Sequence, residues 1–329
     1  MDKKTTRACL GLGGSAWAAR VRKRFTLGMN VTVKLSQMRP DDLPSVLALV
    51  RASGDVRHLS IDELHHRSFG DPSSPQDLRL VARVAGEVVG FCIACILEGR
   101  GIIKLFGVRE AQRRKGVATA LFDELETRLR SRGIAEVAAE GVGPNYFLPG
   151  VELSHTDIIA FLMHRGYETD RKARVDLEVD LERTDLDTTQ DEGRLRAEGI
   201  ILRRARPGEV EATAAFALEG FSAVWQAEVA HSADFCPPRL FVALESERIV
   251  GFAAYDVDGT ARFGPMAVDP GYRRRGIGTA LLKMCLRSIR DNGYLRSEIG
   301  WVGPIGFYAR AVNARIHRVY WTFSKSLVE

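Results

Sequence analysis

GVREAQRRKGVATALFDELETRLRSRG, from Gly107 to Gly133, and AVDPGYRRRGIGTALLKMCLRSIRDNG, from Ala267 to Gly293, are two copies of one pattern. They align without a gap, about 160 residues apart in a chain of 329. Each copy contains the end of an apolar strand, a polar turn, a basic loop with a glycine and an amphipathic helix. The chain therefore repeats one strand–loop–helix unit, and the two copies indicate two similar halves.

The glycine of each loop is predicted to stand at the N-terminus of a helix, because apolar residues follow it at helical spacing. The first amides of a helix have no intrahelical acceptor, and the helix dipole adds partial positive charge there. Gly116 and Gly276 have no side chain that would keep a ligand away from these amides, and neighbouring Arg and Lys residues add charge. This pattern favours a diphosphate site. The alternative is an ordinary helix start with a solvated basic face, which two copies in register disfavour.

The pattern R-x-x-G-x-[GA] between a strand and a helix resembles the acetyl-CoA pyrophosphate loop of the GNAT acetyltransferase superfamily. The resemblance covers two halves, from about residue 31 to the end, and implies acetyl-CoA as co-substrate with no metal. In the first half the implied CoA-binding residues are Val108, Arg113, Arg114, Lys115, Gly116, Val117, Ala118 and Thr119. In the second half they are Met266, Ala267, Val268, Arg273, Arg274, Arg275, Gly276, Ile277, Gly278 and Thr279.

Strand and helix patterns occur in the same order in both halves, which predicts an α/β (α+β layered) fold used twice. The resemblance implies that each domain has a mixed, mostly antiparallel sheet flanked by helices. The stretch TDLDTTQDEGRLRAEG is polar and without periodicity, so it is predicted as a linker. The expected organisation is a basic disordered extension at 1–30, an N-terminal GNAT-like domain at 31–182, the linker at 183–198 and a C-terminal GNAT domain at 199–329.

Charge and cysteine content limit the possible partners. The first 30 residues contain seven Lys and Arg but one acidic residue, whereas the rest of the chain has 40 basic and 41 acidic residues. The near-neutral remainder disfavours a nucleic-acid partner. Five scattered cysteines fit a reducing compartment, and no apolar run is long enough to cross a membrane. A cytoplasmic protein without a membrane partner is expected.

The resemblance also implies a general acid for the departing thiolate. GNAT enzymes commonly use a tyrosine near the start of the last helix, and Tyr308 in IGFYARAVNARIHRVYW stands at that place. At the matching place in the first half, Leu162 cannot donate a proton. Tyr146 stands nearby in the first half as a possible substitute, and His155 replaces an asparagine found in many relatives. The alternative for Tyr308 is a packing aromatic.

The general base varies in this family. Glu298, on the strand after the repeated helix, is the first candidate and Glu228 the second, although either could be an ordinary surface carboxylate. The backbone N–H of Val268 is the expected oxyanion donor. The segment containing Phe221, Trp225 and His231 is expected to shape the acceptor pocket.

The sequence thus predicts an N-acetyltransferase that transfers acetyl from acetyl-CoA to the amine of a small molecule, with the chemistry in the C-terminal half. Two alternatives stay open, a non-catalytic module that senses acyl-CoA and an enzyme in which both halves catalyse. A monomer with an internal pseudo-dimer is expected, or else a homodimer.

Overall fold

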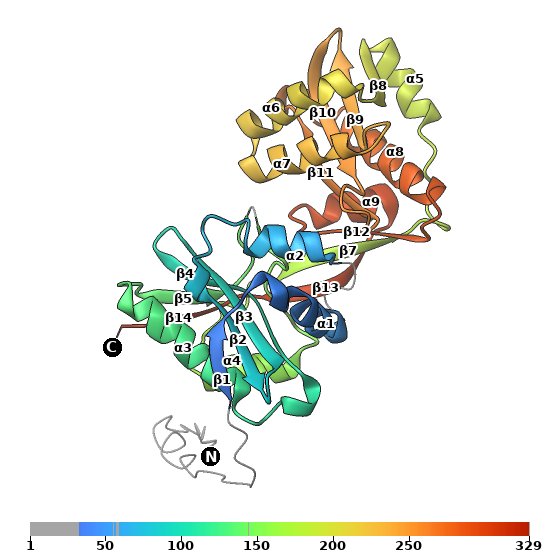
Figure 1. The fold of residues 1–329 in the computed structure, drawn as a ribbon. Coiled ribbons are helices and arrows are strands. Elements are labelled where there is room, and N and C mark those ends of the chain that lie inside the picture. The colour runs from blue at the N-terminus through green and yellow to red at the C-terminus, as the bar shows by residue number, and fades with distance from the viewer. Residues whose placement is uncertain (1–32, 55, 57–58, 144, 329) are drawn as a thin grey trace, which may run out of the picture. The chain divides into compact units, whose positions relative to one another are not determined.

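Both copies of the repeat fold as strand, loop and helix, as predicted (Figure 1). The first comprises β4 (Arg100–Val108) and α3 (Val117–Ser131), and the second β11 (Arg262–Val268) and α8 (Ile277–Asp291). The structure is a computed structural model that describes residues 33–54, 56, 59–143 and 145–328. The extension predicted for residues 1–30 lies outside the described residues.

The first sheet has six strands in the order β1-β2-β3-β4-β5-β14, and only β4 and β5 are parallel neighbours. Helices α1 and α2 cover one face through Val46, Leu64 and their neighbours, and α3 and α4 cover the other through Leu121, Leu162 and theirs. The remaining elements of this part are β1 (Lys34–Gln37), α1 (Leu43–Ser53), α2 (Ile61–Ser68), β2 (Arg79–Val84), β3 (Glu87–Leu97), β5 (Glu136–Ala139) and α4 (Thr156–His164).

The second sheet has eight strands in the order β6-β13-β7-β12-β11-β10-β9-β8, and only β11 and β12 are parallel neighbours. Helices α6 and α7 pack on one face, and α8 and α9 on the other. The elements are β6 (Val151–Glu152), β8 (Ile200–Arg204), α6 (Val210–Gly220), α7 (Ala223–His231), β9 (Leu240–Glu245), β10 (Arg248–Tyr255), β12 (Arg296–Ile299), α9 (Ile305–Val312) and β13 (Arg315–Trp321). The predicted fold class, two mostly antiparallel sheets flanked by helices, is confirmed.

Each sheet includes strands from the opposite half of the chain, β6 and β7 in the second sheet and β14 in the first. β7 (Arg174–Asp180) precedes the second half but pairs with β12 and β13 of the second sheet. β14 (Phe323–Ser326) is the last strand and pairs with β5 of the first sheet. Phe323 is 1% exposed there, and Lys325 forms a 2.7 Å ion pair with Glu126 of α3. The exchange has no local signal in the sequence, and the domain boundaries given above stay a prediction.

The segment predicted as a linker contains a helix, α5 (Thr189–Ala197). One apolar residue of this polar helix, Leu195, is fully buried in the core beneath α8. An ion pair of 3.8 Å between Glu192 and Arg287 also joins α5 to α8. This segment is therefore a packed element of the second half. Within the described part of the chain, no helix combines the length and apolar character needed to span a bilayer.

Candidate active site

The two parallel strand pairs separate before their first strands end. β11 pairs with β12 only at Arg262 and Phe263, and then continues to Val268 without that neighbour. In the first sheet β4 pairs with β5 only from Gly101 to Ile103. Because Asp269 donates its N–H to the Val250 carbonyl (2.9 Å), the alternation of an antiparallel pair turns the Val268 N–H away from β10. The bond from Arg109 to Val89 (2.8 Å) turns the Val108 N–H in the same way.

The loops after these strands share their backbone conformation. Gly116 and Gly276 are the N-cap residues of α3 and α8, with φ of 79° and 85°, and Arg114 and Arg274 also have positive φ. The first intrahelical bonds reach the glycine carbonyls from Ala120 and Ala280. The three amides after each glycine therefore have no intrahelical acceptor and are available to an anion. These residues are Val117, Ala118 and Thr119 in one loop, and Ile277, Gly278 and Thr279 in the other.

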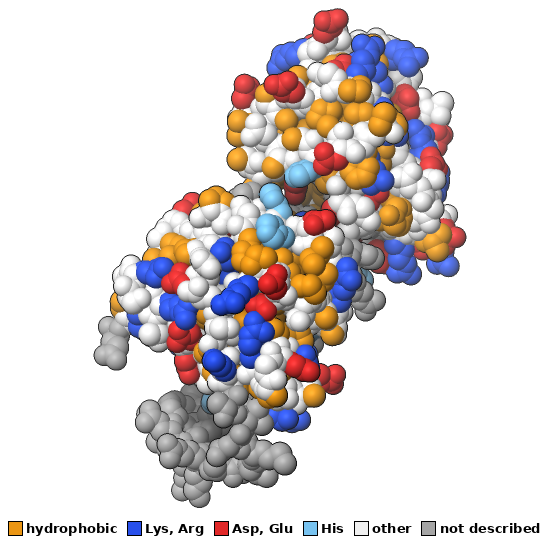
Figure 2. All heavy atoms as spheres, in the orientation of Figure 1, with side chains coloured by type: hydrophobic (Ala, Val, Ile, Leu, Met, Phe, Trp, Pro, Cys, Tyr) orange, Lys and Arg blue, Asp and Glu red, His pale blue; other side chains and the backbone are white. Residues whose placement is uncertain are grey.

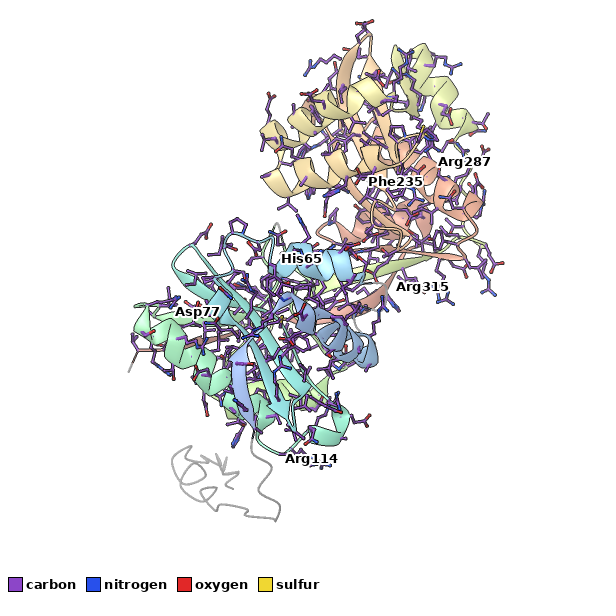
Figure 3. All side chains as sticks on the ribbon, viewed as in Figure 1. His65, Asp77, Arg114, Phe235, Arg287 and Arg315 are labelled. Atoms are coloured by element: carbon purple, nitrogen blue, oxygen red, sulfur yellow. The ribbon has the colours of Figure 1, made fainter. Side chains whose placement is uncertain are left out.

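The predicted loop cations fall into different roles. Arg113 and Arg273 each donate from Nε to the carbonyl of the preceding strand, Val108 at 3.3 Å and Val268 at 3.2 Å, so both hold the turn. Arg114 and Lys115 are exposed, and Figure 3 shows Arg114 in the loop before α3. Arg275 forms a 2.9 Å ion pair with Glu198. Cations predicted for the same role in the two loops thus have different neighbours.

Tyr308 lies on α9 at the second sheet. Its ring packs edge-on against Phe263 (6.2 Å between centroids) and Phe307 (4.9 Å), and the residue is 9% exposed. Burial raises the pKa of Tyr308 to about 12, so the phenol is protonated at neutral pH. Its hydroxyl makes no hydrogen bond with any described residue. Leu162, at the matching place in the first half, is fully buried in the core.

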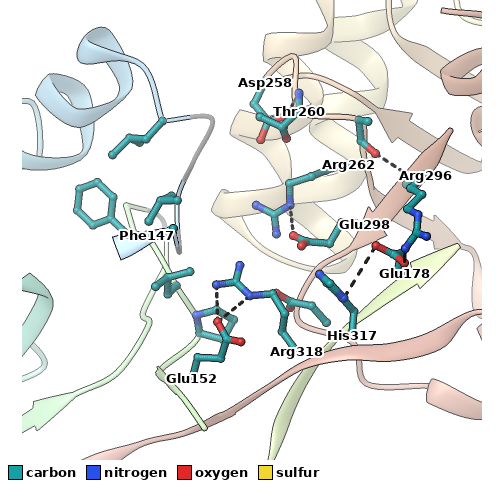
Figure 4. Close-up of a pocket in the computed structure, with 18 of the residues that line it drawn as sticks. Phe147, Glu152, Glu178, Asp258, Thr260, Arg262, Arg296, Glu298, His317 and Arg318 are labelled. Atoms are coloured by element: carbon teal, nitrogen blue, oxygen red, sulfur yellow. Dashed lines mark hydrogen bonds and ion pairs between the residues drawn. The ribbon is translucent and has the colours of Figure 1, made fainter. Parts of the chain in front are cut away.

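Glu298 lies on β12 beside the point where β11 and β12 separate. Its carboxylate forms an ion pair with Arg262 (3.3 Å to Nε), and the side chain is 26% exposed (Figure 4). Burial raises the pKa of Glu298, although Arg262 opposes this shift. The Arg262 guanidinium lies directly against Gly300, where a larger residue would collide with it. A desolvated carboxylate of this kind is a better proton acceptor than a solvated one.

A cavity of about 800 Å³ extends in front of Glu298 (Figure 4). Its floor carries paired charges from β6, β7, β12 and β13. Glu178 pairs with Arg296 at 2.5 Å and lies 3.9 Å from His317. Glu152 pairs with Arg318 at 2.7 Å. The cavity is thus polar and charged, with both signs present, and is large enough for a small molecule.

Two further groups predicted from the sequence surround Arg262. Glu228 of α7 is partly buried; burial raises its pKa, and Arg262 opposes the shift. Glu228 makes no ion pair or hydrogen bond with any described residue. Burial also raises the pKa of Tyr146, and the charges of Arg262 and Glu228 act on it, so Tyr146 lies near the second sheet's site. Its ring packs edge-on against Trp301 at 5.1 Å.

The outer side of this region is apolar. Phe221 and Trp225 stack at 4.9 Å beside α6 and α7, and Phe221 is exposed. Figure 2 shows apolar side chains gathered on the surface over these two helices. His231 pairs with Asp234 at 3.2 Å on the exposed end of α7. The segment therefore offers both aromatic and ionic contacts to a molecule that approaches the site.

The corresponding space in the first sheet is smaller, a cavity of about 50 Å³ between β4 and the end of β5. Lys104, on β4 after its last pairing with β5, forms a 2.5 Å ion pair with Asp71, and the side chains are 1% and 5% exposed. Its Nζ also donates to the Arg67 carbonyl at 2.5 Å. The residue 160 positions later is Gly264, and a Cβ there would meet nothing within 4 Å. The second site therefore has a glycine beside a large cavity where the first has a buried ion pair beside a small one.

The sequence reasoning missed Lys104, Asp71 and Arg262. Lys104 had a visible signal, because it is the one charged residue in the apolar run IIKLFGV. Arg262 and Asp71 had none, since their roles depend on contacts across the sheet. Among the described residues, no group of three or more His, Cys, Asp or Glu is arranged to hold a metal ion.

Two family models match this chain, one over each copy of the repeat. The family model described as "Acetyltransferase (GNAT) family" matches residues 49–147, and the one described as "Acetyltransferase (GNAT) domain" matches residues 237–311. An acetyltransferase of Sodalis glossinidius is 33% identical over 107 residues, which are 32% of this chain and 72% of that protein. An acetyltransferase of Photorhabdus laumondii is 32% identical over 108 residues, with the same coverage.

Solved structures cover more of the chain. The GCN5-related N-acetyltransferase from Sphaerobacter thermophilus matches with a TM-score of 0.64 at 19% identity, over 90% of this chain and 96% of that one. The tandem GNAT protein from the clavulanic acid biosynthesis pathway matches with a TM-score of 0.65 at 16% identity, over 91% and 99%. A glucosamine N-acetyltransferase region of a fungal multi-domain β-N-acetylglucosaminidase gives 0.69 at 21% identity, and the chain spans 38% of that protein.

At these identities the structural matches show the fold, and the closer sequence relatives show the family. The repeated loops, the separated parallel strands and the two matched regions agree with one another. The chain belongs to the GNAT family of acetyltransferases, as a tandem N-acetyltransferase that uses acetyl-CoA as co-substrate.

Proposed function

We propose that this enzyme acetylates the amine of a small molecule, and that the reaction takes place where β11 and β12 separate. One contrast carries the proposal. The second site has Tyr308, Glu298 and open space at Gly264, whereas the first has Leu162 and a buried Lys104–Asp71 pair in the corresponding places. The alternative in which both halves catalyse is disfavoured by the same contrast.

Acetyl-CoA is proposed to lie along the free edge of β11. The N–H groups of Met266 and Val268 face that edge, and the amides after Gly276 stand at its end, where the diphosphate would bind. Arg274 and Arg275 would add charge, and Arg273 would keep the turn in place. The residues from Val108 to Thr119 form the equivalent surface in the first half, and we propose that it binds CoA without catalysis or serves as a scaffold.

The proposed chemistry balances two protons. A carboxylate, Glu298 first and Glu228 second, takes the proton that the amine loses, directly or through water. The amine nitrogen then bonds to the acetyl carbon, while the Val268 N–H stabilises the oxyanion. When the carbon–sulfur bond breaks, Tyr308 gives its proton to the thiolate of CoA. The raised pKa of Glu298 and that of Tyr308, about 12, suit these two directions of transfer.

Calorimetric titration with acetyl-CoA tests where the co-substrate binds. Gly116→Glu and Gly276→Glu share the strain of a positive φ, and the new side chain at Gly276 would in addition meet Arg194. We expect Gly276→Glu to abolish acetyl-CoA binding at the second loop, and with it the release of CoA in the presence of a panel of amines. We also expect Gly116→Glu to leave that release intact. Loss of release in Gly116→Glu alone would place the reaction in the first half.

A non-catalytic sensor of acyl-CoA remains the second candidate. It would keep both loops, and titration would detect binding without CoA release for any amine. Release that depends on Tyr308 excludes a sensor, provided that the acceptor is among the amines tested.

A further inference from the structure

The two glycines that cap the repeated helices have different neighbours. A Cβ built on Gly116 meets nothing within 4 Å. A Cβ built on Gly276 would lie 2.5 Å from Nη2 of Arg194 and 3.7 Å from Oδ1 of Asp191. Arg194 belongs to α5, the helix between the two halves, so an element outside the repeat brings a guanidinium to the second loop only.

Arg194 is carried by a helix that is packed in place. Leu195, the next residue, is fully buried in the core that α8 also forms. Glu192 pairs with Arg287, which Figure 3 shows on α8, and Lys283 of α8 pairs with Asp185 at 3.2 Å. These contacts fix α5 against the helix whose N-terminus forms the loop, so the position of Arg194 at the loop is a property of the fold.

The charges around the loop form a chain of alternating sign. Glu198 accepts from Arg194 at 3.0 Å and from Arg275 at 2.9 Å, and Asp191 pairs with Arg194 at 3.2 Å. The side chains of Arg194 and Glu198 are 44% and 36% exposed, so their ion pair contributes little and can be exchanged. A diphosphate oxygen between the two guanidinium groups would replace the Glu198 carboxylate with a group of greater charge.

We propose that Arg194 is a ligand of the acetyl-CoA diphosphate, acting together with Arg275 and the amides after Gly276. The inference rests on the proposed function, because it assumes that acetyl-CoA binds at the second loop. It adds a residue that lies outside both copies of the repeat and has no counterpart at the first loop. The two loops would therefore differ in affinity although their sequences are alike.

The test is calorimetric titration of the full chain with acetyl-CoA and with its 3′-dephospho form. Arg194→Ala should weaken binding of both by about tenfold, the usual effect of losing a charged hydrogen bond. Arg194→Lys should retain part of the affinity, since it keeps the charge without the two-pronged geometry. Arg196→Ala is the matched control, because it removes an exposed arginine from the same helix, and it should change the dissociation constant less than twofold.

Four results would overturn the assignment. Unchanged affinity in Arg194→Ala would remove Arg194 from the site, and tighter binding would mean that α5 obstructs the loop. A loss seen with acetyl-CoA but absent with the 3′-dephospho form would move Arg194 to the 3′-phosphate. If Gly276→Glu binds acetyl-CoA like the parent chain, the proposed function fails at its first step, and the inference fails with it.

Discussion

At the scale of single residues, burial affects the two groups proposed to transfer protons in opposite directions. Tyr308 is packed between Phe263 and Phe307, and its hydroxyl has no partner among the described residues. Glu298 is desolvated but keeps Arg262 beside it. A buried phenol holds its proton until a stronger base, such as a departing thiolate, forms next to it. This difference between the two groups supports their assignment as acid and base.

Tyr308→Phe tests the acid. The substitution keeps the ring contacts with Phe263 and removes the proton donor, so kcat should fall about 10²- to 10⁴-fold while the acetyl-CoA dissociation constant stays within about twofold. Steady-state rates of CoA release and calorimetry measure the two quantities. Tyr294→Phe is the control, because among the described residues the Tyr294 hydroxyl donates only to the Gly259 carbonyl. An unchanged kcat in Tyr308→Phe would make Tyr308 a packing aromatic.

If Glu298 is the general base, its protonation determines how the rate falls on the acid side of the pH–rate profile. The carboxylate must be ionised to accept a proton, and burial raises its pKa above the ordinary value of 4.5. The rate should therefore fall as pH falls, with its midpoint above the ordinary glutamate value. Glu298→Gln should lower kcat and remove this limb, measured as CoA release against pH. If the limb persists in Glu298→Gln and disappears in Glu228→Gln, the base is Glu228.

At the scale of elements, the helices that could be predicted are those whose start and apolar face are determined by neighbouring residues in the sequence. The helix starts at Val117 and Ile277 were predicted, because a glycine and an apolar stripe with helical spacing determine them within a few residues. Helix α5 was missed, because TQDEGRLRA has one buried residue, Leu195, and therefore no apolar stripe. The approach of Arg194 to Gly276 follows from the packing of α5 on α8, and no pattern in the nearby sequence predicts it.

The buried Lys104–Asp71 pair is another contact that local pattern does not reveal. Asp71→Asn should destabilise the protein by about 3–5 kcal/mol, because it leaves the Lys104 charge buried without its partner. Urea unfolding measures the difference. The double variant Lys104→Met with Asp71→Leu should recover most of the loss, since it removes both charges together.

The control for this pair is Asp170→Asn. Asp170 pairs with Lys172 at 3.5 Å on the surface, with side chains 51% and 85% exposed, so its loss should leave the urea midpoint almost unchanged. If Asp71→Asn has a similarly small effect on urea unfolding, the Lys104–Asp71 pair does not stabilise the protein.

At the scale of the whole molecule, the exchanged strands make the two sheets depend on each other. Polar and apolar residues alternate in RVDLEVD of β7, but alternation does not specify the partner strand. The pairing of β7 with β12 and of β14 with β5 therefore could not be predicted from the sequence. Because each sheet is completed by a strand from the other half, neither half is expected to be stable by itself.

The exchange predicts that a change near the C-terminus loosens the first sheet. Phe323 is 1% exposed in the core that includes Tyr167 and α3, so Phe323→Ala should cost about 3–5 kcal/mol of stability. Hydrogen exchange measured by mass spectrometry should show faster exchange in β5, the partner of β14, although β5 lies more than 180 residues earlier in the chain. Ile316→Ala is the control, because Ile316 lies on β13 and is 55% exposed. If protection in β5 is unchanged and only the second sheet loosens, β14 does not complete the first sheet in solution.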